Sequence, residues 1–189
     1  MSSLVLELPQ LFVGHLVEVL RARRLRTILL KQNSGLSLGK RVEIRSPDRL
    51  RLGKDVMIDS GVLLHCGGME WSGGEGGILI GDATYVGPNS VLFGAGGIEI
   101  GGSVLISPGV VITSHQHTFA QRDLPIRLQP SEFAPVLIED NVWIGSNATI
   151  LPGVRIEKGS VIGAGAVVTH NVPAGSLYVG VPARFLREL

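Results

Sequence analysis

The chain of 189 residues has few charged residues, few aromatic residues and only one cysteine. Charged residues make up 17% and the formal net charge is +1, which gives no reason to expect a nucleic acid partner. The lone Cys66 excludes a disulfide within the chain and suits a reducing cytosol. No apolar run approaches the length of a membrane span, and no basic segment of a signal peptide begins the chain. We expect a cytoplasmic protein, with membrane association left open but not indicated.

Glycine and apolar residues are abundant, with 26 glycines and an apolar share of 44%. This length is ample for one domain with its own core, and the scarcity of charge suggests that much surface is buried against other subunits. Apolar residues at helical spacing over 9–31 predict one or two short amphipathic helices. We therefore divide the chain into an N-terminal helical segment, 1–39, and a second domain, 40–189.

Beyond residue 40 the helical period gives way to aliphatic residues that recur every six positions. The longest series is Ile138, Ile144, Ile150, Ile156, Ile162 and Val168. Turn residues such as Gly81-Asp82 and Asp140-Asn141 separate successive hexads, so each hexad is a very short strand followed by a corner. Three hexads make a triangular coil of about eighteen residues, and stacked coils align the aliphatic residues into one core. The pattern predicts an all-β fold, a left-handed parallel β-helix of about five coils, whose flat faces favour a homotrimer.

The repeat breaks at three places, and such breaks are where function is expected. Residues 67–77, "GGMEWSGGEGG", form a glycine-rich excursion that matches no phosphate-binding loop, and Trp71 within it is a candidate ligand contact. Residues 93–97 make a short slip that we interpret as a loose corner. The longest break is the protruding loop 116–135, which contains three prolines, follows His115 directly and is long enough to reach a neighbouring subunit.

With these features in view, the chain resembles the hexapeptide-repeat acyltransferases, in particular the maltose, galactoside, nodulation-factor and surface-polysaccharide O-acetyltransferases. The resemblance covers roughly residues 40–189 and rests on "VITSHQH", "VWIGSNATILPGV", "VIGAGAVVTHNVP" and "GVPARFLREL" in that order. Residues 1–40 do not resemble the N-terminal segment of the maltose and galactoside enzymes, which argues against those particular sugars.

The resemblance implies a homotrimer with active sites between subunits, acetyl-CoA as co-substrate and a sugar or saccharide acceptor, in surface polysaccharide or lipopolysaccharide biosynthesis. His115 corresponds to the catalytic base, and Asn89 to an asparagine that contacts the acceptor or the thioester. The resemblance also implies coenzyme A contacts. These are Ser146, Ala164, Thr169, His170, Arg184 and Arg187. His170 stands where relatives commonly carry lysine, which would make a phosphate contact there weaker or dependent on protonation.

The residue types suit direct transfer of an acyl group. Imidazole takes a proton near neutral pH, so His115 would accept the proton of the attacking hydroxyl and return one to the departing thiolate. His117 faces the same side of an extended strand and could orient the substrate or His115. We expect Trp143 to wall the pantetheine arm or to pack against the next coil. Arginines suit phosphate because a guanidinium binds it bidentately, although Arg187 is equally explained as a solvated charge.

Three other functions stay open. The first is N-acetylation of an amino sugar or of a xenobiotic, which demands less of the base. The second is a zinc hydratase resembling the γ-class carbonic anhydrases, for which His65, His115 and His117 are the available trio, although the leading interpretation requires no metal. The third is a non-catalytic trimeric scaffold. The identity of the acceptor, the length of the acyl chain, and the roles of the N-terminal helix and of residues 67–77 cannot be read from the sequence.

Overall fold

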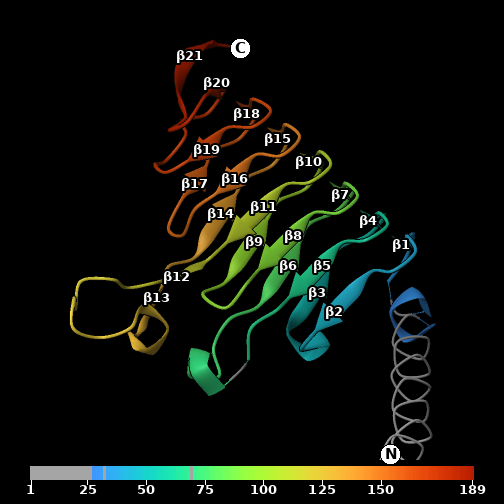
Figure 1. The fold of residues 1–189 in the computed structure, drawn as a ribbon. Helices are drawn as coiled ribbons and strands as arrows, with labels where there is room; N and C mark the ends of the chain where they lie inside the picture. Colours follow the sequence, from blue (N-terminus) through green and yellow to red (C-terminus); the bar gives the residue numbers. More distant parts are fainter. Residues whose placement is uncertain (1–26, 32, 69) are drawn as a thin grey trace, which may run out of the picture.

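The structure, a computed structural model, describes residues 27–31, 33–68 and 70–189, and it is built from three parallel sheets around one core (Figure 1). The eight-stranded sheet contains β1 (Ser37–Leu38), β4 (Met57–Ile58), β7 (Tyr85–Val86), β10 (Leu105–Ile106), β15 (Trp143–Ile144), β18 (Val161–Ile162), β20 (Ser176–Val179) and β21 (Arg184–Glu188). The six-stranded sheet contains β2 (Glu43–Arg45), β5 (Leu63–His65), β8 (Val91–Phe93), β11 (Val111–Thr113), β16 (Thr149–Ile150) and β19 (Val167–Val168). The five-stranded sheet contains β3 (Leu50–Leu52), β6 (Ile78–Ile80), β9 (Ile98–Ile100), β14 (Val136–Ile138) and β17 (Arg155–Ile156).

The chain visits the three sheets in turn, and the strands of these sheets pair in parallel with the strand one coil away, except that β21 pairs antiparallel with β20. In the eight-stranded sheet, for example, Ile106 lies beside Val86 on one side and Ile144 on the other. These aliphatic side chains point inward and are buried, and each contributes about 1.5–3 kcal/mol through burial of apolar surface. The six-residue period thus reflects one inward residue per short strand, and the predicted parallel β-helix is confirmed.

Two of the three corners of each coil are tight turns that use a left-handed residue. Between the eight-stranded and six-stranded sheets these residues are Arg41, Gly61, Asn89, Gly109, Asn147 and Gly165. Glycine and asparagine tolerate a positive φ better than other residues do. The turns stack because, from Gly61 onward, each such residue donates its N–H to the coil before it, as Asn147 does to the Pro108 carbonyl at 3.0 Å. Asp55, Ala83, Ser103, Asn141 and Gly159 serve similarly at the corner between the five-stranded and eight-stranded sheets.

The third corner, between the six-stranded and five-stranded sheets, is irregular, and we call it the loop corner. Segments 46–49, 66–77, 94–97 and 114–135 leave the coils there. They contain three short 3-10 helices, η1 (Pro47–Arg49), η2 (Glu70–Ser72) and η3 (Ile126–Leu128), and an antiparallel pair, β12 (His115–His117) with β13 (Ser131–Phe133). In Figure 1 the loops that carry η2 and η3 project from the same side of the β-helix.

The predicted helical segment over 9–31 lies outside the described residues except for 27–31, which are helical. Leu29 of this turn is buried against the first coil. The first strand begins at Ser37, three residues before the predicted boundary at residue 40. No helix in the described part of the chain is long and apolar enough to cross a membrane.

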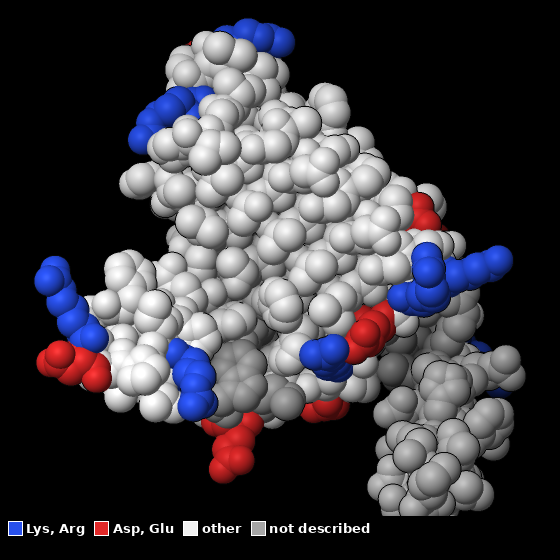
Figure 2. Space-filling view, in the orientation of Figure 1, with Lys and Arg blue, Asp and Glu red and all other residues white. Residues whose placement is uncertain are grey.

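The outer faces of the three sheets differ in charge. Outward positions of the eight-stranded sheet are Met57, Tyr85, Leu105, Trp143, Val161 and Leu177. Outward positions of the six-stranded sheet are charged only in the first coil, at Glu43 and Arg45, and continue as Leu63, Val91, Val111, Thr149 and Val167. The five-stranded sheet instead presents Arg51, Leu79, Glu99, Leu137 and Arg155. Figure 2 likewise shows a broad uncharged centre with charged side chains at its margins.

Candidate active site at the loop corner

A row of aromatic and imidazole rings runs along the loop corner. His65 ends β5 and lies 5.8 Å between ring centroids from Phe93, which ends β8. Phe93 meets His115 edge to face at 6.0 Å, and His115 stacks against Phe133 at 6.2 Å. Residues 65 and 93 are neighbours because parallel pairing aligns the last residues of β5 and β8. The fold therefore seats His115 between the end of a coil strand and the returning arm of the long loop.

His115 is held by the first residue pair of the loop. It pairs antiparallel with Phe133, and the Thr113 hydroxyl donates a hydrogen bond to the His115 carbonyl at 2.9 Å. The side chain is half-buried, with its Nδ1 atom shielded from solvent. Burial lowers the pKa of His115 below the ordinary 6.5, and the positive charges that His117 and His65 can carry lower this pKa further. The ring is consequently neutral and able to accept a proton at neutral pH.

The loop beyond His115 is internally organised. The Gln116 amide donates to the Glu132 carboxylate at 3.3 Å, and the Thr118 N–H donates to the Pro130 carbonyl at 3.0 Å. Buried Gln129 joins the two arms, because its amide nitrogen donates to the carbonyls of Gln121 and Leu124, each at 2.9 Å. Phe119, two residues beyond His117, is 75% exposed. The loop thus presents an exposed apolar side chain close to its root.

His117 and the C-terminal pair Thr169 and His170 lie at the same corner as His115. His117 is exposed on β12, two residues beyond His115. Thr169 and His170 follow β19, where the chain turns from the six-stranded sheet towards Val172, which bridges to Ile156 of the five-stranded sheet. The Thr169 hydroxyl and His170 Nδ1 are 2.7 Å apart. The structure therefore places these residues in line along one edge of the β-helix.

Three other predicted contact residues lie at a different corner. Asn89, Ser146 and Ala164 all sit where the chain passes from the eight-stranded to the six-stranded sheet. Asn89 adopts a left-handed conformation and donates its N–H to the Ser60 carbonyl at 3.0 Å, as a corner residue does. A single chain does not bring these three residues to His115.

Trp143, Arg184 and Arg187 belong to the eight-stranded sheet, which faces away from the loop corner. Trp143 is 48% exposed, and its indole N–H donates to the Ser107 hydroxyl at 3.0 Å. Both arginines are exposed on β21, where each guanidinium donates to a neighbouring carbonyl, of Ala183 at 3.0 Å and of Glu188 at 3.1 Å. The predicted site residues are thus distributed over the loop corner, a regular corner and one sheet.

The other reactive side chains near the loop corner have local structural surroundings. Cys66 follows β5, is fully buried, and burial raises the pKa of its thiol to about 12, which opposes thiolate formation. His65 is 6% exposed and its Nδ1 accepts a hydrogen bond from the Gly67 N–H at 3.4 Å. Across residues 27–31, 33–68 and 70–189, no cluster of three or more His, Cys, Asp and Glu side chains is arranged to hold a metal ion.

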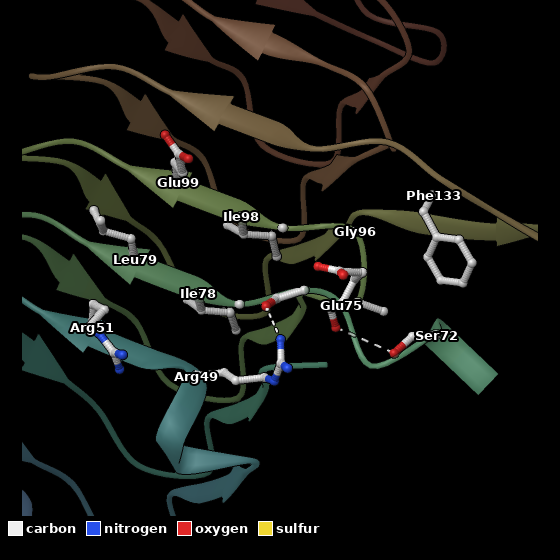
Figure 3. Close-up of a pocket in the computed structure, with 14 residues that line it drawn as sticks. Arg49, Arg51, Ser72, Glu75, Ile78, Leu79, Gly96, Ile98, Glu99 and Phe133 are labelled. Carbon is white, nitrogen blue, oxygen red and sulfur yellow. Dashed lines mark hydrogen bonds between the residues drawn. The ribbon is translucent and has the colours of Figure 1, made fainter. Parts of the chain in front are cut away.

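A cavity of about 460 Å³ opens beside the ring row, and no sequence motif predicted it. Arg49, Arg51, Glu75, Glu99, Gly96 and Phe133 are among its lining residues (Figure 3). A second cavity of about 410 Å³ shares Arg49, Arg51 and Gly76 with it, so we call the two together the trough. The segment 93–97, which we interpret from the sequence as a loose corner, also contributes to the lining of the trough. The side chain of Trp71, the predicted ligand contact, lies outside what the structure describes. The missed signal was that successive breaks in the repeat fall at the same corner.

Fold and site together define a class: a parallel β-helix with a half-buried, neutral histidine at the root of a long loop that leaves one corner. Comparison with known proteins agrees. The bacterial transferase hexapeptide family (six repeats) matches residues 135–170. The hexapeptide-repeat-containing acetyltransferase VCA0836 of Vibrio cholerae, solved in complex with acetyl coenzyme A, is 30% identical over 87% of this chain and 76% of that chain, with a TM-score of 0.57. The chain belongs to the hexapeptide-repeat transferase family.

Two further relatives differ in how much they share. AntD is an N-acyltransferase from Bacillus cereus that was solved with dTDP and 3-hydroxybutyryl-CoA. The match is 23% identical, spans 82% of this chain and 81% of AntD, and has a TM-score of 0.71. At that identity the likeness concerns the fold alone. YJL218W, a proposed acetyltransferase of Saccharomyces cerevisiae, is 42% identical over 113 residues, which are 59% of this chain and 56% of that protein. The chain therefore spans about half the length of this curated relative.

Proposed function

We propose that the protein is an acetyl-CoA-dependent O-acetyltransferase that acetylates a hydroxyl of a sugar or saccharide by direct transfer, with His115 as the general base. The observation that carries this proposal is His115 itself. Its ring is half-buried at the root of the long loop, and its pKa is lowered by burial, so it is neutral where it must accept a proton. Family membership supports the donor, because the 30% identical VCA0836 was solved with acetyl coenzyme A.

In the proposed reaction, the neutral imidazole accepts the proton of the acceptor hydroxyl as its oxygen attacks the thioester carbonyl. The carbon–sulfur bond then breaks, and the imidazolium returns the proton to the departing thiolate, which leaves as coenzyme A. Cys66 takes no part as a nucleophile because its pKa of about 12 keeps it protonated. Partial exclusion of water around His115 strengthens its hydrogen bond to the hydroxyl.

A homotrimer would complete the site. The uncharged outward residues of the eight-stranded and six-stranded sheets form two flat faces suited to burial between copies of the chain. Trp143 and Asn89 lie away from the loop corner of their own chain, so they can approach a His115 only when that histidine belongs to another copy. Sedimentation analysis tests the assembly. We expect a trimer, and a protein that is monomeric at all concentrations would contradict this part of the proposal.

The activity is tested by thiol release from acetyl-CoA with a panel of sugars and amino sugars. We expect coenzyme A to appear only when a saccharide acceptor is present, with one acetyl ester formed per thiol released. Mild alkali distinguishes the two acceptor chemistries, because it cleaves an O-acetyl ester and leaves an N-acetyl amide intact. An alkali-stable product would favour the second candidate function, N-acetylation of an amino sugar. AntD, which shares the fold, is an N-acyltransferase.

A further inference from the structure

The trough ends at Phe133, the ring that stacks on His115. Phe133 forms one of its walls and stacks on His115 at a centroid separation of 6.2 Å. Gly96 lies against this wall, and a methyl group there would meet Phe133 Cβ at 3.3 Å and the Ala134 nitrogen at 3.0 Å. From Phe133 the trough extends across β9 and β6 towards β3, as Figure 3 shows. A molecule lying in it would therefore have one end at Phe133, the neighbour of the His115 ring.

The other end of the trough is lined by two arginines, Arg49 and Arg51, and one acidic residue, Asp48, so positive charge exceeds negative charge there. The guanidinium of Arg49 donates to the Gly76 carbonyl at 3.0 Å, and that of Arg51 donates to the Asp48 and Leu50 carbonyls at 2.7 and 3.1 Å. These carbonyls hold the arginine side chains without neutralising them. Among the described residues neither arginine forms an ion pair, whereas Arg45 is paired with Glu43 and Arg155 with Glu139.

Between these ends the lining suits hydroxyl groups. Glu75 and Glu99 contribute carboxylates that accept hydrogen bonds, and Gly76, Gly77 and Gly97 expose backbone. Phe133 offers a ring face to the carbon–hydrogen face of a sugar. The carboxylates would repel a small free anion, so the combination favours an extended polyhydroxylated molecule whose negative group is confined to the arginine end.

We propose that the trough is the acceptor subsite and that the acceptor is a saccharide bearing an anionic group, a phosphate or a carboxylate, which Arg49 and Arg51 bind. This inference rests on the proposed transferase function and narrows its substrate class. The sugar ring lies beside Phe133, where one hydroxyl meets His115, and the guanidinium forks take the anionic group through bidentate hydrogen bonds. In the proposed trimer, burial of the other two faces would leave the outer face of the five-stranded sheet, and this subsite on it, open to solvent.

The test is calorimetric titration of the full-length protein with glucose 1-phosphate, glucuronic acid and glucose. We expect at least one anionic sugar to bind about tenfold or more tightly than glucose, because charge-assisted hydrogen bonds are the stronger kind. Arg51→Ala should remove this advantage, and Arg51→Lys should restore part of it by returning the charge without the fork. Higher salt should weaken the anionic sugar selectively. Equal binding of all three sugars, or no binding of either anionic sugar, overturns the proposal.

Arg155→Ala is the matched control, since Arg155 occupies the same outward register of the five-stranded sheet but is paired with Glu139. It should leave binding of the anionic sugar unchanged, and equal loss in the two variants would overturn the assignment to Arg51. Arg49→Lys serves in place of Arg49→Ala, because Arg49 also supports residues 67–77 through Gly76.

Titration with coenzyme A separates this inference from the proposed function. Arg51→Ala should bind coenzyme A like the wild type, and weaker coenzyme A binding would make the trough a donor site and overturn the subsite. His115→Ala should still bind the anionic sugar while losing turnover. Binding of an anionic sugar without any acetyl transfer would contradict the proposed function and support the subsite. Acetyl transfer that depends neither on the charge of the acceptor nor on Arg51 would support the function and contradict the subsite.

Discussion

The regular corners and the loop corner of the β-helix are built from the same repeat but behave differently. At the corner between the eight-stranded and six-stranded sheets, left-handed residues such as Gly109 and Asn147 recur once per coil, and their backbone hydrogen bonds stack the turns. At the loop corner, segments of 4 to 22 residues leave the coil in its N-terminal part and bring His115, Phe133 and Arg49 together. The repeat therefore forms the rigid scaffold, and the candidate functional residues lie on segments that leave the repeat at one and the same corner.

The largest expected effect is the loss of the imidazole at the loop corner. Replacement of His115 by alanine should lower kcat by about 10²–10⁴-fold, the usual contribution of a general base. His117→Ala is the control two residues further along the strand, and it should cost less than about tenfold. Thiol-release kinetics measure both, with circular dichroism to show that the β-helix is retained. Equal losses in the two variants would remove the special role of His115.

The free energy of unfolding should respond strongly to changes in the coil and weakly to changes in the loop. Ile112 is fully buried in β11, and Ile112→Ala should lower the free energy of unfolding by about 2–5 kcal/mol because a cavity remains. Ile126 in the loop is 57% exposed, and Ile126→Ala should change the stability by less than about 0.5 kcal/mol. Chemical denaturation measures both. A loop variant as unstable as the core variant would show that the loop is part of the folding unit.

Asn89 and Asn147 occupy equivalent left-handed positions and separate a turn role from a catalytic role. Alanine at either position should destabilise by about 1–2 kcal/mol, the cost of the left-handed conformation, and glycine should restore most of it. We expect Asn89→Gly alone to reduce acetyl transfer, by about tenfold, because it removes an acceptor contact as well. If Asn89→Gly and Asn147→Gly are equally active, Asn89 is a turn residue only.

The smallest expected effect is on pH dependence. Because burial lowers the pKa of His115 below 6.5, kcat/KM should decline only when the pH falls below that value. His117→Gln removes a neighbouring positive charge and should move this decline to a higher pH. Since the unfolded chain binds a proton at His115 more readily, folding stability should also fall as the pH drops through about 6.5. A decline that stays at the same pH in His117→Gln would contradict coupling between the two rings.

Much of the fold could be predicted from the sequence, because one inward aliphatic residue per hexad leaves a periodic trace. The series from Ile138 to Val168 maps onto strands of all three sheets. His115 could be named because it stands where the period stops. Arg49, Arg51 and Phe133 could not be grouped, because Arg49 lies in a short turn, Arg51 in strand β3 and Phe133 in the long loop, and only the stacking of the coils brings them to one trough.

The parallel β-helix, the long loop and the histidine at its root follow from the amino-acid sequence, because they depend on a local period and on its interruption. Which side chains meet depends on how the coils stack. Stacking of parallel coils brings Arg49, Gly96 and Phe133 to one trough beside His115, and it places Asn89 and Trp143 elsewhere. Each coil is triangular and its loops differ in length. Residues far apart in the sequence therefore become neighbours when their coils place them at the same corner.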